Sequence, residues 1–129
     1  MAKNPQSEIR QSYVHNRMVI IAPKRGTRPH NVADTSEKVD VGQKADGPDP
    51  FSVESQKNVK ALLTLHGPEK PWSVKVIRNL FPAVSLDNPN VYGTQEVVVE
   101  TPRRHVDLAD LSLPQMEKVL EAYQLRTKA

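Results

Sequence analysis

The chain has 129 residues, of which 37% are hydrophobic and only 5% aromatic, and it carries a formal net charge of +3. This length predicts one domain, residues 1–129, with a modest core built from Val, Leu, Ile and Ala. The absence of cysteine excludes disulfides, thiolate metal ligands and a thiol nucleophile, and the mild basic excess favours an anionic small ligand over nucleic acid.

The first predicted element is a strand at residues 17–23, where a run rich in β-branched residues ends at a proline. Residues 1–12 before it are polar and expected to be loose. Residues 24–30, KRGTRPH, contain glycine and proline and are predicted to form a loop. Residues 31–58 are the most polar part of the chain and predict a long loop.

Three more strands are predicted at residues 59–65, 72–78 and 94–102. A helix follows at residues 112–128, with Ser112 as its N-cap and Gln115 completing a capping box. Helical spacing predicts one buried face, composed of Leu113, Met116, Val119, Leu120 and Tyr123. The pattern predicts an α+β fold: an antiparallel sheet of about four to five strands with the C-terminal helix packed on one face.

Two groups of residues could bind an anion or a nucleoside. Arg25 and Arg28 flank Gly26, with Lys24 beside them, and two guanidinium groups on a turn can grip a phosphate. The alternative is a solvated basic loop. Asn79 at a strand end can read a ribose hydroxyl or a base edge, but it can equally cap its own turn.

Glu96 and Glu100 lie on one face of a predicted strand. Paired carboxylates can perform acid–base chemistry, but here they are interpreted as the solvent-facing side of the strand.

Four blocks of the chain, in order, resemble the galactose-1-phosphate uridylyltransferase family of histidine-triad-like nucleotidyltransferases. The first is a strand that ends in Ala-Pro and is followed by R-x-x-R-P, and the second is WSVKVIRNLFPAV. The third is YGTQEVVVETP, and the fourth is the segment LADLSLPQMEKVL. Together they cover most of residues 13–126. Plant-type relatives that act on ADP-glucose share these blocks.

The resemblance implies a partial histidine-triad-like domain, the N-terminal part of an enzyme of galactose and carbohydrate metabolism. Such enzymes transfer a nucleoside monophosphate between a nucleotide sugar and a sugar phosphate through a nucleotidyl-histidine. Carried over by match, Arg25 and Arg28 contact the nucleotide phosphates, Asn79 holds the nucleoside, and Phe81 shapes the wall beside it. The implied partners are a UDP-sugar or another nucleotide sugar and a sugar phosphate, with a homodimer possible.

The chain departs from the family pattern at two places. The family's zinc ligands C-P-F-C are replaced by D-P-F-S, which puts Asp49 and Ser52 at the ligand positions, and Arg104 stands at a third. No zinc and no other cofactor are therefore expected. The nucleophilic H-x-H-x-Q motif does not occur in the 129 residues, so the chain alone is expected to be catalytically silent.

An alternative interpretation is a non-catalytic nucleotide-binding or interaction module that kept the fold. The preference for uridine or adenosine is left open. No apolar run is long enough to span a membrane, and the N-terminus lacks the apolar stretch of a secretory signal, so a soluble cytoplasmic protein is expected, without a membrane or nucleic-acid partner.

Overall fold

The computed structural model of the chain describes residues 6–27 and 49–129. Contacts divide the chain into two compact units. The sheet unit comprises residues 39–78 and 96–129, and the hairpin unit comprises residues 1–38 and 79–95. The interpretation of residues 1–129 as one domain stays a prediction, and so does the loop at 31–58, of which residues 31–48 lie outside the described ranges.

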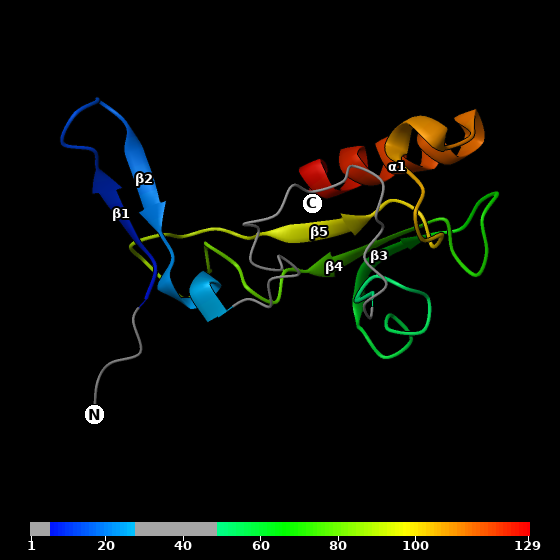
Figure 1. The fold of residues 1–129 in the computed structure, drawn as a ribbon, viewed down its shortest axis with the longest axis horizontal. Coiled ribbons are helices and arrows are strands. Elements are labelled where there is room, and N and C mark those ends of the chain that lie inside the picture. The colour runs from blue at the N-terminus through cyan, green and yellow to red at the C-terminus, as the bar shows by residue number, and fades with distance from the viewer. Residues whose placement is uncertain (1–5, 28–48) are drawn as a thin grey trace, which may run out of the picture. The chain divides into compact units, whose positions relative to one another are not determined.

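The sheet unit contains three antiparallel strands in the order β3-β4-β5. They are β3 (Ala61–Leu65), β4 (Val74–Arg78) and β5 (Glu96–Val99), and each lies within a predicted strand. β-Branched residues fill β4 and β5 because their stiff side chains suit a pleated, buried surface. Helix α1 (Leu113–Lys128) lies along one face of this sheet (Figure 1).

The core of the sheet unit lies between β4 and α1. Val74 and Val76 alternate along β4 onto the same face, as the period of two in a strand requires, and they meet Val119 and Ala122 of the helix. All four are fully buried. Six partly buried side chains complete the cluster: Leu62, Leu63, Leu65, Val98, Leu111 and Met116.

Helix α1 begins as predicted but is rotated from the predicted orientation. The Ser112 hydroxyl accepts a hydrogen bond from the Gln115 backbone N–H, which confirms the N-cap. The predicted buried face is wrong in part, because Leu113 is 74% exposed and Leu120 is 58% exposed. Val119 is buried as predicted, and Gln115 and Ala122 are buried in addition.

Gln115 explains this rotation. Its side-chain amide donates to the backbone carbonyls of Ser73, at 2.7 Å, and of Glu100, at 2.9 Å. These bonds use the side chain that the predicted capping box would have turned back to the start of the helix. The polar side chain therefore faces the sheet, and Leu120 turns toward solvent.

The hairpin unit is built on a second sheet of two antiparallel strands, β1 (Glu8–Gln11) and β2 (Met18–Ile21), with Ile9 opposite Ile20. Two expectations for this part of the chain are wrong. Part of the N-terminal segment expected to be loose forms β1, because its backbone pairs with β2. The predicted loop after β2 begins as the 3-10 helix η1 (Pro23–Thr27), in which the Thr27 hydroxyl donates to the Lys24 carbonyl at 2.8 Å.

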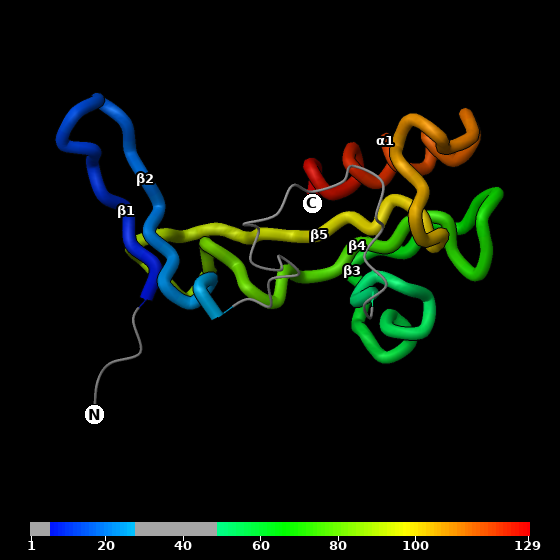
Figure 2. Tube along the Cα trace, viewed as in Figure 1, coloured from blue at the N-terminus to red at the C-terminus, as the bar shows by residue number. Residues whose placement is uncertain are grey.

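The rest of the hairpin unit comes from the connection between β4 and β5. The chain leaves β4 at residue 79, runs through the turns of residues 79–95 and returns to begin β5 (Figure 2). The α+β class is confirmed, but the five described strands form two separate sheets and not one. Within the described residues, no helix is long and apolar enough to cross a membrane.

Candidate functional site

Three of the four predicted binding residues meet at the backbone of Phe81 in the hairpin unit. The Arg25 guanidinium donates from Nη1 to the Phe81 carbonyl oxygen at 2.9 Å, across 56 positions of sequence. The Asn79 side-chain oxygen accepts from the Phe81 N–H at 3.0 Å. Arg28, the fourth residue, lies outside the described ranges.

The turn that carries Asn79 and Phe81 is also fixed from its other side. The Asn79 N–H donates to the Gln95 carbonyl at 3.1 Å. The Gln95 side-chain oxygen accepts from the Ala83 N–H at 2.9 Å. The segment from Asn79 to Ala83 is thereby tied to the chain that leads into β5, and η1 holds it through Arg25.

These contacts bear on the alternatives that the sequence left open. The bond between Asn79 and the Phe81 N–H is the turn-capping arrangement that asparagine commonly makes. Arg25 is half-buried and uses one N–H on Phe81. A guanidinium has five N–H donors, so the others can still contact an anion. A role of Arg25, Asn79 and Phe81 in nucleotide binding stays a prediction.

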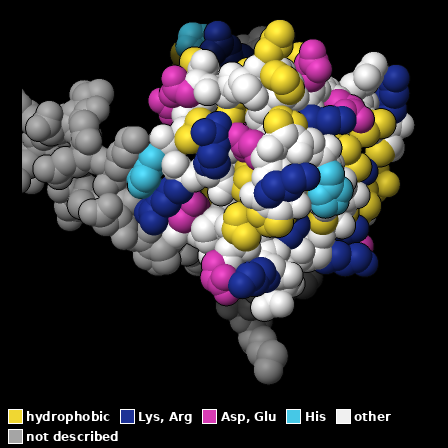
Figure 3. Space-filling model, turned by 90° about the vertical axis from the view of Figure 1, so that its right-hand side faces the viewer, with side chains coloured by type: hydrophobic (Ala, Val, Ile, Leu, Met, Phe, Trp, Pro, Cys, Tyr) yellow, Lys and Arg dark blue, Asp and Glu magenta, His cyan; other side chains and the backbone are white. Residues whose placement is uncertain are grey.

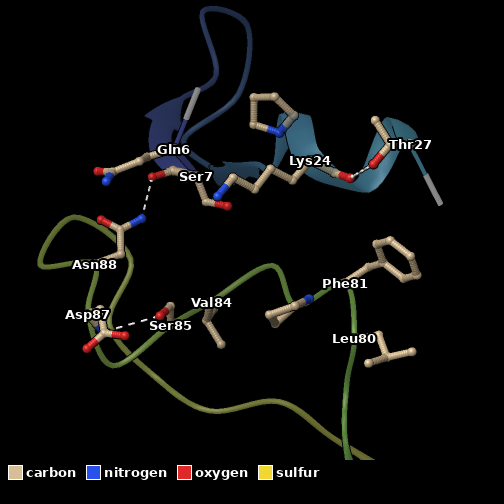
Figure 4. Close-up of a pocket in the computed structure, with 12 residues that line it drawn as sticks. Gln6, Ser7, Lys24, Thr27, Leu80, Phe81, Val84, Ser85, Asp87 and Asn88 are labelled. Carbon is tan, nitrogen blue, oxygen red and sulfur yellow. Dashed lines mark hydrogen bonds between the residues drawn. The ribbon is translucent and has the colours of Figure 1, made fainter. Parts of the chain in front are cut away.

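A hollow of about 720 Å³ lies in the same unit, within the size range of small-molecule pockets. Polar groups from η1 and from the two residues before β1 face apolar side chains from residues 80–84 across it (Figure 4). Its lining consists of Gln6, Ser7, Pro23, Lys24, Thr27, Leu80, Phe81, Pro82, Val84, Ser85, Asp87 and Asn88.

Lys24 lines this hollow, whereas its neighbour Arg25 does not. A 3-10 helix has about three residues per turn, so consecutive side chains point in different directions. Arg25 therefore reaches the Phe81 carbonyl while Lys24 extends into the hollow. Sequence reasoning noted Lys24 only as a neighbour of the two arginines, and recognising a helical turn at residues 23–27 was the signal that would have separated the two cations.

Asp49 and Ser52, two of the three positions at which the resemblance implies zinc ligands, lie in a hydrogen-bonded turn of the sheet unit. Asp49 Oδ1 accepts from the Phe51 N–H at 2.9 Å, and Ser52 Oγ accepts from the Ser55 N–H at 3.2 Å. The Ser55 hydroxyl donates to the Asp49 carbonyl at 2.8 Å. Among the described residues, no three His, Cys, Asp or Glu side chains are grouped so as to hold a metal ion. The expected lack of zinc stays a prediction.

Glu96 and Glu100 are not simply a solvent-facing pair. Both Glu96 oxygens accept from the Arg126 guanidinium of α1, at 2.8 and 2.6 Å, and this hydrogen bonding lowers the pKa of Glu96 below its ordinary value. Glu100 accepts from the Tyr123 hydroxyl, and this bond raises the pKa of Tyr123 to about 12. Each carboxylate ties the helix to the sheet, which argues against an acid–base pair.

Charged side chains of both signs are interspersed on the face shown in Figure 3. Lys and Arg alternate there with Asp and Glu and with hydrophobic side chains. Among the described residues that this view shows, Lys and Arg do not form a continuous stripe.

Comparison with known proteins finds a similarity to part of one plant enzyme. No family model matches it. It is 27% identical over 139 residues to ADP-glucose phosphorylase of Arabidopsis thaliana, an alignment that covers 96% of this chain and 39% of the relative. The chain thus spans about two-fifths of the relative's length.

The comparison with solved structures agrees with the sequence comparison. The crystal structure of an ADP-glucose phosphorylase from Arabidopsis thaliana with bound ADP-glucose matches with a TM-score of 0.54 and 27% identity. The match covers 95% of this chain and 37% of that chain. This chain is similar to part of a nucleotide-sugar enzyme. The relative is a phosphorylase of ADP-glucose, so the similarity supports the broad expectation and does not single out a galactose-1-phosphate uridylyltransferase.

Proposed function

We propose that the chain is the nucleotide-sugar-binding part of a nucleotidyltransferase related to ADP-glucose phosphorylases and galactose-1-phosphate uridylyltransferases. The observation that carries the proposal is the similarity over 96% of the chain to ADP-glucose phosphorylase, together with the structural likeness to such an enzyme with bound ADP-glucose. Arg25 and Asn79 bond to the carbonyl and to the N–H of Phe81, and this supports the proposal because it fixes three predicted binding residues within one unit.

Each residue has a stated role in this proposal. The N–H groups of Arg25 that Phe81 does not use, together with Arg28, neutralise charge on the diphosphate. Asn79 holds the nucleoside with its side-chain amide, and the Phe81 ring forms the adjacent wall. The 129 residues contain no H-x-H-x-Q motif, so the proposal assigns them binding and charge neutralisation. The second substrate is a sugar phosphate.

Calorimetric titration of the full chain with ADP-glucose, UDP-glucose, AMP and UMP tests the proposal. We expect heat with at least one nucleotide sugar, and an affinity about tenfold or more lower in Arg25→Met, because a hydrogen bond to a charged group is lost. Arg25→Lys, which keeps the charge but loses the planar fork, should fall between the two.

The matched control is Arg10→Met, which removes the same charge from β1, where Arg10 pairs with Glu8. It should bind like the unmodified chain. No heat with any of the four ligands, or equal affinity in Arg25→Met and Arg10→Met, would overturn the proposed nucleotide site. The comparison of ADP-glucose with UDP-glucose also decides the nucleoside preference that the sequence left open.

A further inference from the structure

Strand β1 of the hairpin unit pairs with β2 on one side, and no described strand pairs with its other edge (Figure 1). The Ser12 N–H donates to the Arg17 carbonyl at 2.9 Å, in register with the ladder between β1 and β2. In an antiparallel pair, opposite residues alternate between hydrogen-bonded and non-hydrogen-bonded positions. Arg10, two residues before Ser12, therefore directs its backbone groups toward β2, whereas Ile9 and Gln11 direct theirs toward the open edge.

This open edge has a definite end. By the same alternation the Ser7 carbonyl points to the open edge, and it already accepts from the Asn88 side-chain amide at 2.8 Å. Among residues 6–27 and 49–129, no hydrogen bond engages the outward backbone groups of Ile9 or Gln11. Open N–H and C=O groups on a strand edge can pair with another strand. Residues 9–11 are therefore the part of β1 that can accept one.

The side chains of the hairpin also favour a further strand. Ile9 lies opposite Ile20 on one face, and the two side chains are 44% and 45% exposed. Glu8 and Arg10 lie on the other face and form an ion pair with each other. A two-stranded hairpin is only marginally stable in water, and additional strands with an apolar face stabilise it. Another strand at β1 would therefore stabilise the hairpin.

The segment Glu8-Ile9-Arg10 is complementary to itself when two copies run antiparallel. With Ile9 opposite Ile9 of the second copy, Glu8 of each chain lies opposite Arg10 of the other, and opposite charges across strands stabilise a pair. Ile9 directs its backbone groups outward, so the two isoleucines exchange two hydrogen bonds in this register. The same register aligns Ile20 and Ile9 of both copies in one apolar row across four strands. Shifting the centre to Arg10 would place like charges opposite each other.

We propose that the open edge of β1 binds a second copy of this chain and forms a four-stranded antiparallel sheet about a two-fold axis at Ile9. The two copies of β2 are the outer strands of this sheet. The surface uses none of the residues assigned to nucleotide binding, so it stands or falls independently of the proposed function. Only a few residues of each strand make the contact, so the dimer is weaker than one with an interface of standard size.

Analytical ultracentrifugation of the full chain over a series of concentrations tests the charge pattern. We expect a concentration-dependent dimer. Arg10→Glu and Glu8→Arg each place like charges opposite each other, so each alone should weaken self-association about tenfold or more. An equimolar mixture of the two variants restores opposite charges and should associate like the unmodified chain. Lys57→Glu makes the same charge reversal at an exposed residue of the sheet unit and should leave association unchanged.

A single cysteine tests the register, because the chain contains none of its own. Hydrogen-bonded opposite residues have Cα atoms about 5.5 Å apart, which a disulfide can span. Ile9→Cys should therefore form a covalent dimer when oxidised glutathione is the oxidant. Val14→Cys, at a residue that is 82% exposed and lies beyond β1, is the control and should form one about tenfold more slowly or less.

Recovery of association in the mixture also shows that both charge variants keep the hairpin, because an unfolded hairpin could not pair. The proposal is overturned if the unmodified chain stays monomeric at every concentration, or if the mixture associates no better than either variant alone. It is also overturned if Val14→Cys forms covalent dimers as fast as Ile9→Cys, since the contact would then have no defined register.

Discussion

Each of the two units of this molecule is stabilised internally by a different kind of interaction. Of the eight buried hydrophobic residues among the described ones, seven belong to the sheet unit and only Val91 to the hairpin unit. The hairpin strands leave apolar side chains exposed, among them Met18, Val19 and Ile20. The described part of the hairpin unit is joined by hydrogen bonds between distant segments, such as Arg25 to Phe81 and Asn88 to Ser7.

This difference indicates which unit can tolerate unpaired polar groups for binding a ligand. A packed core is dense and dry, so its polar groups must be paired within the protein. A unit joined by directional bonds can leave a hollow and an unengaged ammonium at its surface. The candidate binding residues all lie in this second kind of unit, apart from Arg28, which the structure does not describe.

The largest effect that tests the contrast is expected from Val76→Ala. Val76 is fully buried between β4 and α1, and its truncation leaves a cavity. The free energy of unfolding should fall by about 2 kcal/mol or more, measured by urea denaturation. Val19→Ala on β2 makes the same change at a side chain 45% exposed, and it should cost less than about 1 kcal/mol. Equal losses in the two variants would contradict the contrast.

A smaller and local effect is expected from Arg25→Met in the absence of ligand. Losing the bond to the Phe81 carbonyl should free the turn of residues 79–83, so the amide hydrogens of Phe81 and Ala83 should exchange about tenfold faster. The amide of Val98 in β5 serves as the internal control and should keep its rate. Faster exchange in both units alike would show that the contact supports the whole fold and not one turn.

The smallest effect concerns pH and the sheet unit. The Arg126 hydrogen bonds lower the pKa of Glu96 below the ordinary 4.5, so the pair stabilises the fold above pH 4.5, and this contribution is lost as the pH falls through the lowered pKa. Arg126→Met should raise the pKa of Glu96. The free energy of unfolding should then decrease less as the pH falls. Carboxyl-carbon NMR of Glu96 measures the pKa directly.

Lys118→Met is the control for this titration, because it removes another cation of α1, one that pairs with Glu121. The pKa of Glu96 should not move in that variant. An unchanged pKa in Arg126→Met would show that the guanidinium does not set the titration of Glu96.

The sequence predicts best what local chemistry decides. The β-branched runs of β4 and β5 and the Ser112 cap of α1 depend on neighbouring residues, and all three are where the pattern places them. Strand β1 was missed because EIRQ is polar and becomes a strand only through pairing with β2. The buried face of the helix was predicted only partly correctly. Apolar periodicity cannot show that a glutamine will bond to two distant carbonyls.

For the candidate site, too, the sequence indicated residues but not the long-range contacts between them. The resemblance singled out Arg25, Asn79 and Phe81 as residues, but the bond of Arg25 to the Phe81 carbonyl is a contact across 56 positions, which no local pattern encodes. Lys24 was noted only as a neighbour of the two arginines, because residues 24–30 were predicted to form a loop. A loop does not separate neighbouring side chains in a regular way, and a helical turn does.

The Gln115 side chain also determines the rotation of helix α1 about its own axis. Helix α1 has apolar side chains around much of its circumference, including the exposed Leu113, Leu120 and Leu125. Hydrophobic contact is non-directional, so several rotations of such a helix about its own axis would bury similar apolar area. An amide that donates to two carbonyls makes both bonds at one rotation only, and its side-chain oxygen is buried without a partner among residues 6–27 and 49–129. The chain therefore gives up some stability at Gln115 and gains a single orientation of its helix.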